Sequence, residues 1–317
     1  MRLFAGLLVL VALSATFPAF AQGRPLRVLY LSQSVGFVHE TTRRPLGGLA
    51  PSERALQTMA DDSGAFTVEL TQDARDITAD RLSDLDVLMF STTGALPIEH
   101  DAWAAIVAWI ESGRGGFIGV HSATDTSLAF DGGEAAYVDF IGGKFDGHPW
   151  TEGTPIRLAN LEPTHPLAAM WPDATDYAEE IYQYSSFRPE RVRVLQALDM
   201  RAGPLRRPYP VPVTWIRQIG QGRLFYTNLG HTLSTWDDPR FRSQILAAIR
   251  WTGRRTEAPA DPNLEVQDQA AIDAFTASEG APPAWEQDHA AQAIRALQPL
   301  YVEEGPDAEA NRAPPVR

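Results

Sequence analysis

Four short apolar runs, spread from Arg27 to His121, limit what this chain can fold into. Three of them are continuous, as in strands that are buried on both faces, and one alternates polar and apolar residues. Segments with helical apolar spacing lie between them, the first with Ser52 as its expected N-cap. This order predicts an α/β fold with a doubly wound, mostly parallel sheet. The runs are Arg27–Ser32, Phe66–Thr71, Asp86–Ser91 and Gly116–His121, and the clearest intervening helix is Glu99–Ser112.

The second half of the chain predicts shorter strands. Val211–Ile219 and Arg223–Leu229 flank Gly220-Gln221-Gly222 and are expected to form a hairpin at the edge of the sheet. We therefore expect one α/β domain over about residues 25–255. Further strands are expected at Thr154–Leu158, Ile181–Ser185 and Val192–Leu198, and a helix at Phe241–Trp251.

Both ends of the chain differ from this pattern. Residues 1–21 are typical of a signal peptide, because Arg2 precedes the run LFAGLLVLVAL, too short to span a bilayer, and Ala19-Phe20-Ala21 forms a small-residue cleavage site. Cleavage after Ala21 predicts a periplasmic or secreted protein, and an uncleaved membrane anchor is the alternative. Residues 256–317 are rich in Ala, Pro and acidic residues, which predicts an extension that is partly helical or disordered. Short helices are expected near Gln267–Ala277 and His289–Leu297.

Composition excludes several classes of site. The chain has no cysteine, so it has no disulfide, thiol nucleophile or thiolate ligand. Asp and Glu number 40 against 27 Lys and Arg, and Lys144 is the one lysine. This acidic balance argues against nucleic acid and against stable association with anionic membranes once the leader is removed. We expect no nucleotide cofactor. The composition neither favours nor excludes a homo-oligomer.

The histidines suggest a site. His39, His121 and His231 each follow a predicted strand, and His148 lies in the Gly-rich segment GGKFDGHPW. Ligands of open α/β sheets bind at the carboxyl ends of the strands, where residues far apart in sequence converge. Imidazole titrates near neutral pH and is the commonest metal ligand. We expect these four histidines to line one pocket, with Asp125 and Glu180 as the nearest carboxylates.

The strongest local feature is Gly119-Val120-His121-Ser122-Ala123, where small residues follow a strand at once. Such a turn lifts a side chain above the sheet edge, as in a nucleophile elbow, and here that side chain is His121. A buried, hydrogen-bonded core histidine is the alternative. A further alternative is a serine hydrolase that uses Ser122, although Ser122 is not flanked as Gly-x-Ser-x-Gly.

Several blocks together resemble the ThuA-like (trehalose-utilisation) family: GVHSATDT, YVDFIGGKFDGHP, THPLAAM, EEIYQY and PVTWIRQIGQGRLFYTNLGH. The resemblance implies the class I glutamine amidotransferase-like fold, a variant of the flavodoxin-like sheet. Amidotransferases of this fold carry cysteine at the elbow, where this chain has His121, so their cysteine chemistry is excluded. The resemblance also implies a histidine at His39, a late-strand histidine at His231 and a carboxylate at Glu180, which we favour over Glu179.

The resemblance implies a carbohydrate substrate, so with the leader we expect an exported carbohydrate-processing enzyme acting on a small glycoside or its keto form. His121 or His231 would move a proton, with Asp125 and Glu180 as the carboxylates of the site. A divalent metal, Zn²⁺ first, would be bound by His39, His121 and His148. A non-catalytic sugar-binding module with the same crevice is the alternative. Aromatic faces for a sugar are expected from Trp150, Tyr182 and Trp236, whereas His165 fits a turn or helix cap.

Overall fold

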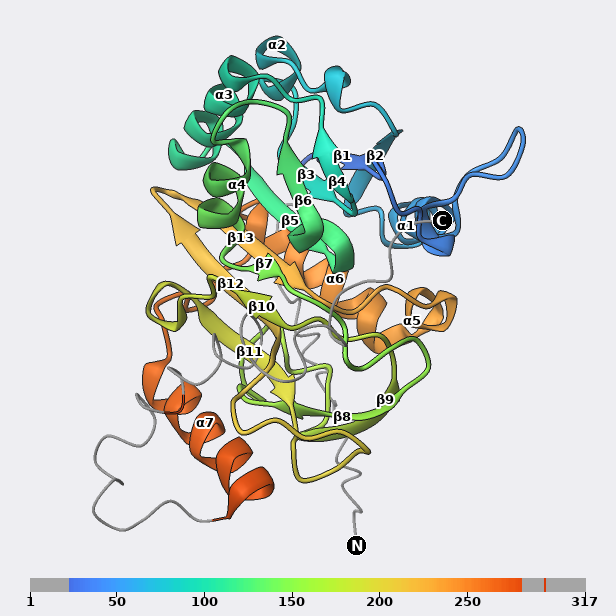
Figure 1. Cartoon of the computed structure of the whole chain (residues 1–317). Helices are drawn as coiled ribbons and strands as arrows, with labels where there is room; N and C mark the ends of the chain where they lie inside the picture. The colour runs from blue at the N-terminus through green and yellow to red at the C-terminus, as the bar shows by residue number, and fades with distance from the viewer. Residues whose placement is uncertain (1–22, 281–293, 295–317) are drawn as a thin grey trace, which may run out of the picture.

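The computed structural model describes residues 23–280 and residue 294. The expected leader, the end of the chain and the helix expected at 289–297, apart from residue 294, lie outside the described residues. A nine-stranded sheet in the order β2-β1-β3-β5-β13-β12-β11-β8-β9 forms the centre of the described structure (Figure 1). Its strands are β1 (Leu26–Leu31), β2 (Phe66–Thr71), β3 (Val87–Phe90), β5 (Gly116–Val120), β8 (Pro155–Asn160), β9 (Ala174–Ala178), β11 (Arg193–Leu198), β12 (Pro212–Ile219) and β13 (Gly222–Thr227).

The parallel half of the sheet comprises β2, β1, β3, β5 and β13, which pair in register as parallel neighbours. In chain order this is the 2-1-3-4-5 arrangement of flavodoxin-like sheets, so the predicted α/β class is confirmed. The order reverses between β1 and β3, at the switch point where such sheets open a crevice at the carboxyl ends of their strands. The loops after β1, β5 and β13 all leave the sheet at this edge.

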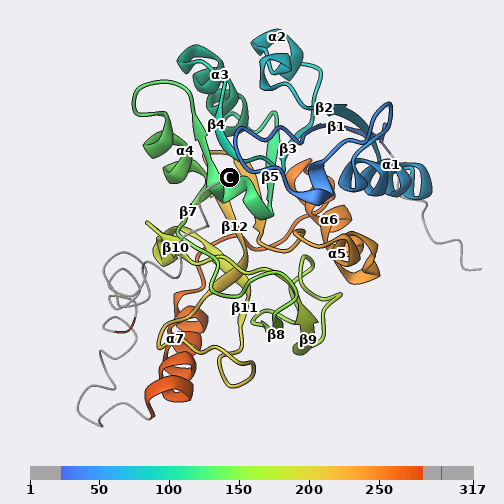
Figure 2. The same ribbon diagram turned by 45° about the vertical axis from the view of Figure 1, so that its right-hand side comes forward.

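The antiparallel half corrects the predicted place of the hairpin. β12 and β13 do form the expected antiparallel pair. The hairpin is not at the sheet edge, however, because β12 also pairs with β11, and β8 and β9 extend the sheet further. Figure 2 shows this extension beside α7 (Leu264–Glu279). β9 was not expected, because its sequence ATDYA is largely exposed and lacks a continuous apolar face.

Successive residues of a strand point to opposite faces of the sheet. Because most strands of the parallel half are apolar on both faces, helices cover both. One face buries Val28 and Val120 with α1 (Pro51–Ser63) and α6 (Pro239–Thr252), and the other buries Leu29 and Phe117 with α2 (Ala79–Leu82), α3 (His100–Glu111) and α4 (Gly133–Ile141). The remaining short elements are α5 (Leu233–Asp237), β4 (Gly94–Leu96), β6 (Thr126–Leu128), β7 (Lys144–Phe145), β10 (Tyr184–Ser185) and the 3₁₀ turns η1 (Glu40–Thr42), η2 (Ala74–Asp76), η3 (His121–Asp125) and η4 (Pro189–Arg191).

The start of α1 differs from the expectation. The N-cap is Ala50 rather than Ser52, because Pro51 occupies the first helical position, where its missing N–H costs nothing. The Glu53 carboxylate at position N3 accepts the backbone N–H of the N-cap Ala50 at 2.9 Å, which is the glutamate half of a capping box. α7 overlaps the helix expected at 267–277. Within residues 23–280 and residue 294, no helix has both the length and the apolar character needed to cross a membrane.

Candidate functional site: a histidine cluster at the carboxyl edge of the sheet

Three histidines and one glutamate meet where the parallel strands end. His39 follows β1, His121 follows β5, His231 follows β13, and Glu180 lies in the connection between β9 and β10. Each offers one ligand-type atom, and these atoms all lie within 4.8 Å of one another. The ring centroids of His39 and His121 are 4.9 Å apart, and those of His39 and His231 are 5.2 Å apart. These four residues are called the His₃Glu cluster below.

His121 is held in a strained backbone conformation, with φ of +46°. A non-glycine residue in this left-handed region is uncommon and concentrates at functional sites. Gly230, directly before His231, has φ of +123°, and a Cβ there would lie 2.8 Å from Val120 Cγ1. Two tight turns from neighbouring strands therefore bring His121 and His231 together.

Hydrogen bonding fixes the tautomer of His121. Its Nδ1 lies 2.7 Å from the carbonyl oxygen of Asn228, so Nδ1 carries the proton and donates it. Nε2 then has a lone pair and faces both the Tyr182 hydroxyl and His231 Nδ1, each at 3.0 Å. The Tyr182 hydroxyl also lies 3.4 Å from His39 Nε2. A backbone carbonyl on the outer imidazole nitrogen is the arrangement that orients metal-ligating histidines.

The two adjacent glutamates have different surroundings. Glu180 approaches His231 Nδ1 at 3.4 Å and His121 Nε2 at 3.8 Å. Glu179 is fully buried and instead accepts the backbone N–H groups of Gly230 at 3.2 Å and Thr232 at 3.1 Å. Glu179 therefore braces the loop that carries His231, whereas Glu180 is the carboxylate of the cluster.

Burial keeps the cluster uncharged. It lowers the pKa of His39 to about 3, with His231 and His148 adding to the effect, and holds the pKa of His121 well below its usual value. Burial also lowers the pKa of His231, although Glu152 opposes this shift. Burial, then Glu179 and Glu152, raise the pKa of Glu180 to about 8. At neutral pH the imidazoles are neutral and keep their lone pairs, and a cation bound among them would displace the proton that the Glu180 carboxyl otherwise keeps.

This shift gives a prediction for Glu180. Below pH 4.5 its carboxyl is protonated in the folded and unfolded chains, whereas between pH 4.5 and 8 only the unfolded chain ionises. Glu180 should therefore lower the free energy of unfolding of the metal-free protein as pH rises through this window, by on the order of a few kcal/mol, while the buried histidines, whose pKa values are lowered, act in the opposite direction below about pH 6.5. Glu180→Gln should remove this contribution, so the free energy of unfolding of the variant minus that of the native protein should increase from pH 5 to pH 8, as measured by urea denaturation in EDTA.

Two comparisons make this test specific. Glu111→Gln, on an exposed position of α3, should keep the full slope. Asp125, whose pKa burial raises to about 6, contributes in the same direction as Glu180 below that pH, and it does so equally in the native protein and in Glu180→Gln. An unchanged slope between pH 6 and 8 in Glu180→Gln would show that Glu180 does not titrate there.

The structure places some expected site residues outside the cluster. Asp125 closes η3 and is not among the four, while His148 is half-buried with its ring centroid 6.3 Å from that of Tyr182. Trp150 and Trp236 belong to the hydrophobic core, each about 2% exposed, and donate to the carbonyls of Leu205 and Gly230. They offer no face to a sugar, because their rings are buried against other side chains of the core. Tyr182 is also buried and meets the cluster through its hydroxyl.

Other residues take ordinary structural roles or complete the site. Ser122 is 1% exposed and does not line the pocket described below. His165 accepts the N–H of Leu167 and donates to the carbonyl of Pro259, as expected for a turn. Sequence reasoning missed Phe37 and Glu152. For Phe37 the available signal was its place in the loop that carries His39.

A pocket of about 510 Å³ opens over the cluster. This size is within the range of small-ligand sites, about 300–1,000 Å³. His39 and His231 reach it, and its walls come from the loops after β1 and β13 and from the segment around Glu152. Its lining includes Phe37, Glu40, Arg43, Glu152, His231 and Leu233.

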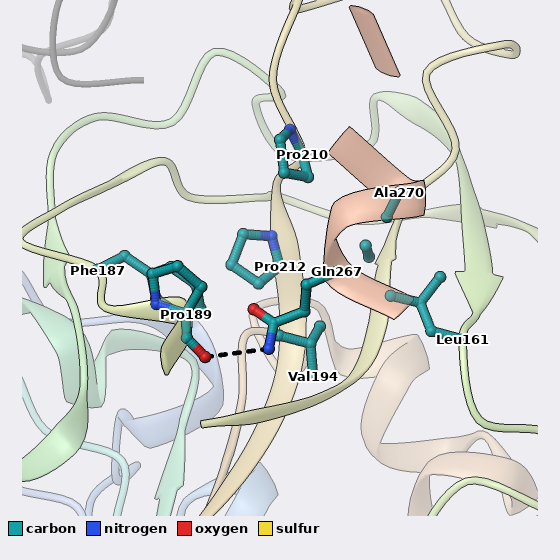
Figure 3. A pocket seen from close by; sticks show the side chains of 9 residues that line it. Leu161, Phe187, Pro189, Val194, Pro210, Pro212, Gln267 and Ala270 are labelled. Atoms are coloured by element: carbon teal, nitrogen blue, oxygen red, sulfur yellow. Dashed lines mark hydrogen bonds between the residues drawn. The ribbon is translucent and has the colours of Figure 1, made fainter. Parts of the chain in front are cut away.

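A second, smaller cavity of about 50 Å³ lies between α7 and the antiparallel half of the sheet (Figure 3). Gln267 projects from α7 and donates to the carbonyl of Pro189 at 3.1 Å. Its lining residues carry no titratable side chain, so this cavity offers no group for acid–base chemistry.

The comparisons with known proteins decide the family. Residues 27–252 match the ThuA family, described as trehalose utilisation. The chain belongs to the ThuA family. Among proteins of curated function, none matches this sequence. Family membership supports a carbohydrate-related role at a coarse level.

Two solved structures of ThuA-like proteins share the fold. One from Bacteroides uniformis is 20% identical, covers 74% of this chain and 95% of its own, and superposes with a TM-score of 0.57. One from Parabacteroides merdae is 14% identical, covers 77% and 99%, and has a TM-score of 0.53. At these identities the likeness shows the fold alone, and the predicted glutamine amidotransferase-like architecture is confirmed.

Proposed function

We propose that this ThuA protein is an exported carbohydrate-processing enzyme that moves a proton on a small glycoside or its keto form, assisted by a divalent metal. The observation that carries the proposal is the His₃Glu cluster at the carboxyl edge of the sheet, with His121 Nε2 turned inward. Family membership supports the substrate class. The leader-like residues 1–21 support export.

The donor set fits a first-row divalent ion such as Zn²⁺. Imidazole nitrogens and a carboxylate are ligands that Zn²⁺ prefers. Nδ1 of His39 is buried and finds no hydrogen-bond partner within the described chain, an unsatisfied polar atom that calls for an explanation. His39, His121 and Glu180, the three buried members, would hold the ion and leave one position open, as in catalytic zinc sites. When bound, the ion would polarise an oxygen of the substrate.

His231 is suited to move the proton. It is the one member of the cluster that is only partly buried, and it lines the pocket. Its Nδ1 lies 3.4 Å from a carboxylate oxygen of Glu180, which accepts the Nδ1 hydrogen when the ion occupies His121 Nε2, so Nε2 of His231 keeps its lone pair. Glu152 lies 3.7 Å from that Nε2 and stabilises the imidazolium formed when His231 takes a proton. A positioned general base of this kind contributes about 10²–10⁴-fold.

The direct test combines metal analysis with turnover. The purified protein should carry close to one divalent ion per chain, and its turnover of trehalose, other disaccharides and their keto derivatives should be lost in EDTA and restored by Zn²⁺. If the metal-loaded protein turns over no member of this panel, the proposed enzyme is rejected, whether or not a sugar binds. The alternative, a non-catalytic sugar-binding module, expected Trp150 and Trp236 to stack on a sugar ring. Both are buried in the core and are not available for such stacking.

A further inference from the structure

Exposed apolar side chains gather at the mouth of the histidine pocket. Phe37 is 52% exposed and Leu233 is 40% exposed, and they line this pocket from the loop after β1 and from the start of α5. Val35, in the same loop as Phe37, is 41% exposed. Only five large apolar side chains are exposed in the described part of the chain, so three on these two segments form a concentration. Exposed apolar groups gathered in this way mark binding sites.

Phe37 is fixed relative to the cluster. Its ring meets the ring of His39 edge to face, with centroids 4.8 Å apart and an interplanar angle of 78°. Since His39 is buried, this contact anchors one edge of Phe37 and leaves the other part of the ring to solvent. A flat apolar surface therefore lies beside the atoms proposed to do the chemistry.

The polar part of the pocket is acidic. Glu40 and Glu152 line it, against the single guanidinium of Arg43. Part of the Arg43 guanidinium is bonded within its own loop, because Nη2 donates to the carbonyl of Val38 at 3.1 Å. The formal charge of the whole chain is −13. Carboxylates accept hydrogen bonds from hydroxyl groups and repel phosphates and other carboxylates.

We propose that this pocket binds an uncharged sugar, with the apolar face of one ring packed on Phe37 and hydroxyl groups donating to Glu40 and Glu152. The site thus selects neutral sugars over phosphorylated or acidic ones. This inference rests on the proposed function and specifies its substrate class. A sugar ring has one face of C–H groups and a rim of hydroxyls, which matches an apolar plate bordered by acceptors.

The test is calorimetric titration of the purified protein with trehalose, maltose and cellobiose, and with trehalose 6-phosphate as the charged counterpart. At least one neutral disaccharide should bind, and trehalose 6-phosphate should bind about tenfold more weakly than trehalose, or not at all. Phe37→Ala should weaken neutral binding about tenfold, which corresponds to 1.4 kcal/mol. Phe37→Trp, which keeps an aromatic plate, should bind nearly as well as the native protein.

Leu46→Ala is the matched control, because Leu46 is fully exposed but does not line the pocket, and it should change nothing. Unchanged binding in Phe37→Ala, equal or tighter binding of trehalose 6-phosphate, or no neutral binding at all would overturn the inference. Binding of a neutral disaccharide that depends on Phe37 but is never turned over would support the inference while rejecting the proposed enzyme.

Discussion

Replacing His121 by asparagine is expected to abolish metal binding and turnover together while the protein stays folded. Asparagine tolerates the left-handed backbone that His121 adopts at φ of +46°. Its amide can also replace Nδ1 as the donor to the Asn228 carbonyl, while nothing remains at the position of Nε2. The variant therefore removes the inward-facing nitrogen and little else. Metal content by mass spectrometry and turnover of the disaccharide panel measure the two losses.

Control variants separate this effect from general damage. His148→Ala, close to the cluster but outside it, should keep its metal, and His100→Ala, on the exposed start of α3, should behave as the native protein. His121→Ala is the harsher variant, because alanine is disfavoured at this backbone conformation and leaves the Asn228 carbonyl without its donor. Full metal content in a folded His121→Asn protein would remove His121 from the proposed ligand set.

The sequence predicts the parallel half of the fold well, and physical reasons explain why. A strand buried on both faces must be apolar throughout, so runs such as those in β1, β3 and β5 stand out from any other local pattern. β9 is exposed on alternate positions and carries polar residues, so nothing in its local sequence separates it from a loop. The place of the hairpin in the sheet also depends on its pairing with β11, and no local pattern specifies which strands pair.

The same contrast holds at the site. His39, His121 and His231 each follow a parallel strand, so topology alone brings them to one edge of the sheet. Asp125 and His148 lie on turns beyond that edge, where exact position depends on backbone conformation that spacing does not give. Tryptophan near a site can equally fill the core, and Trp236 does so. Phe37 was missed for the opposite reason, since nothing local shows that a loop phenylalanine stays exposed.

Replacing His231 by glutamine is expected to lower kcat about 10²–10⁴-fold while metal content remains unchanged. Glutamine has similar length and can still donate toward Glu180, but it cannot accept a proton at neutral pH. The split between the two measurements is what distinguishes a general base from a ligand, because a ligand would lose both. Loss of the metal in His231→Gln would place His231 in the coordination set and return the proton transfer to another group.

Glu152→Gln provides the matching test of how His231 is tuned. The Glu152 carboxylate raises the pKa of His231, against the lowering by burial, so its removal should lower that pKa further. A general base works in its neutral form, so the acid limb of the kcat/KM profile reports its pKa in the free enzyme. That limb should move to lower pH in Glu152→Gln, with a smaller loss of turnover than in His231→Gln, because the base itself is retained. An acid limb that stays in place, or moves to higher pH, would show that Glu152 does not stabilise the His231 imidazolium. The group that carries the proton would then be another member of the cluster.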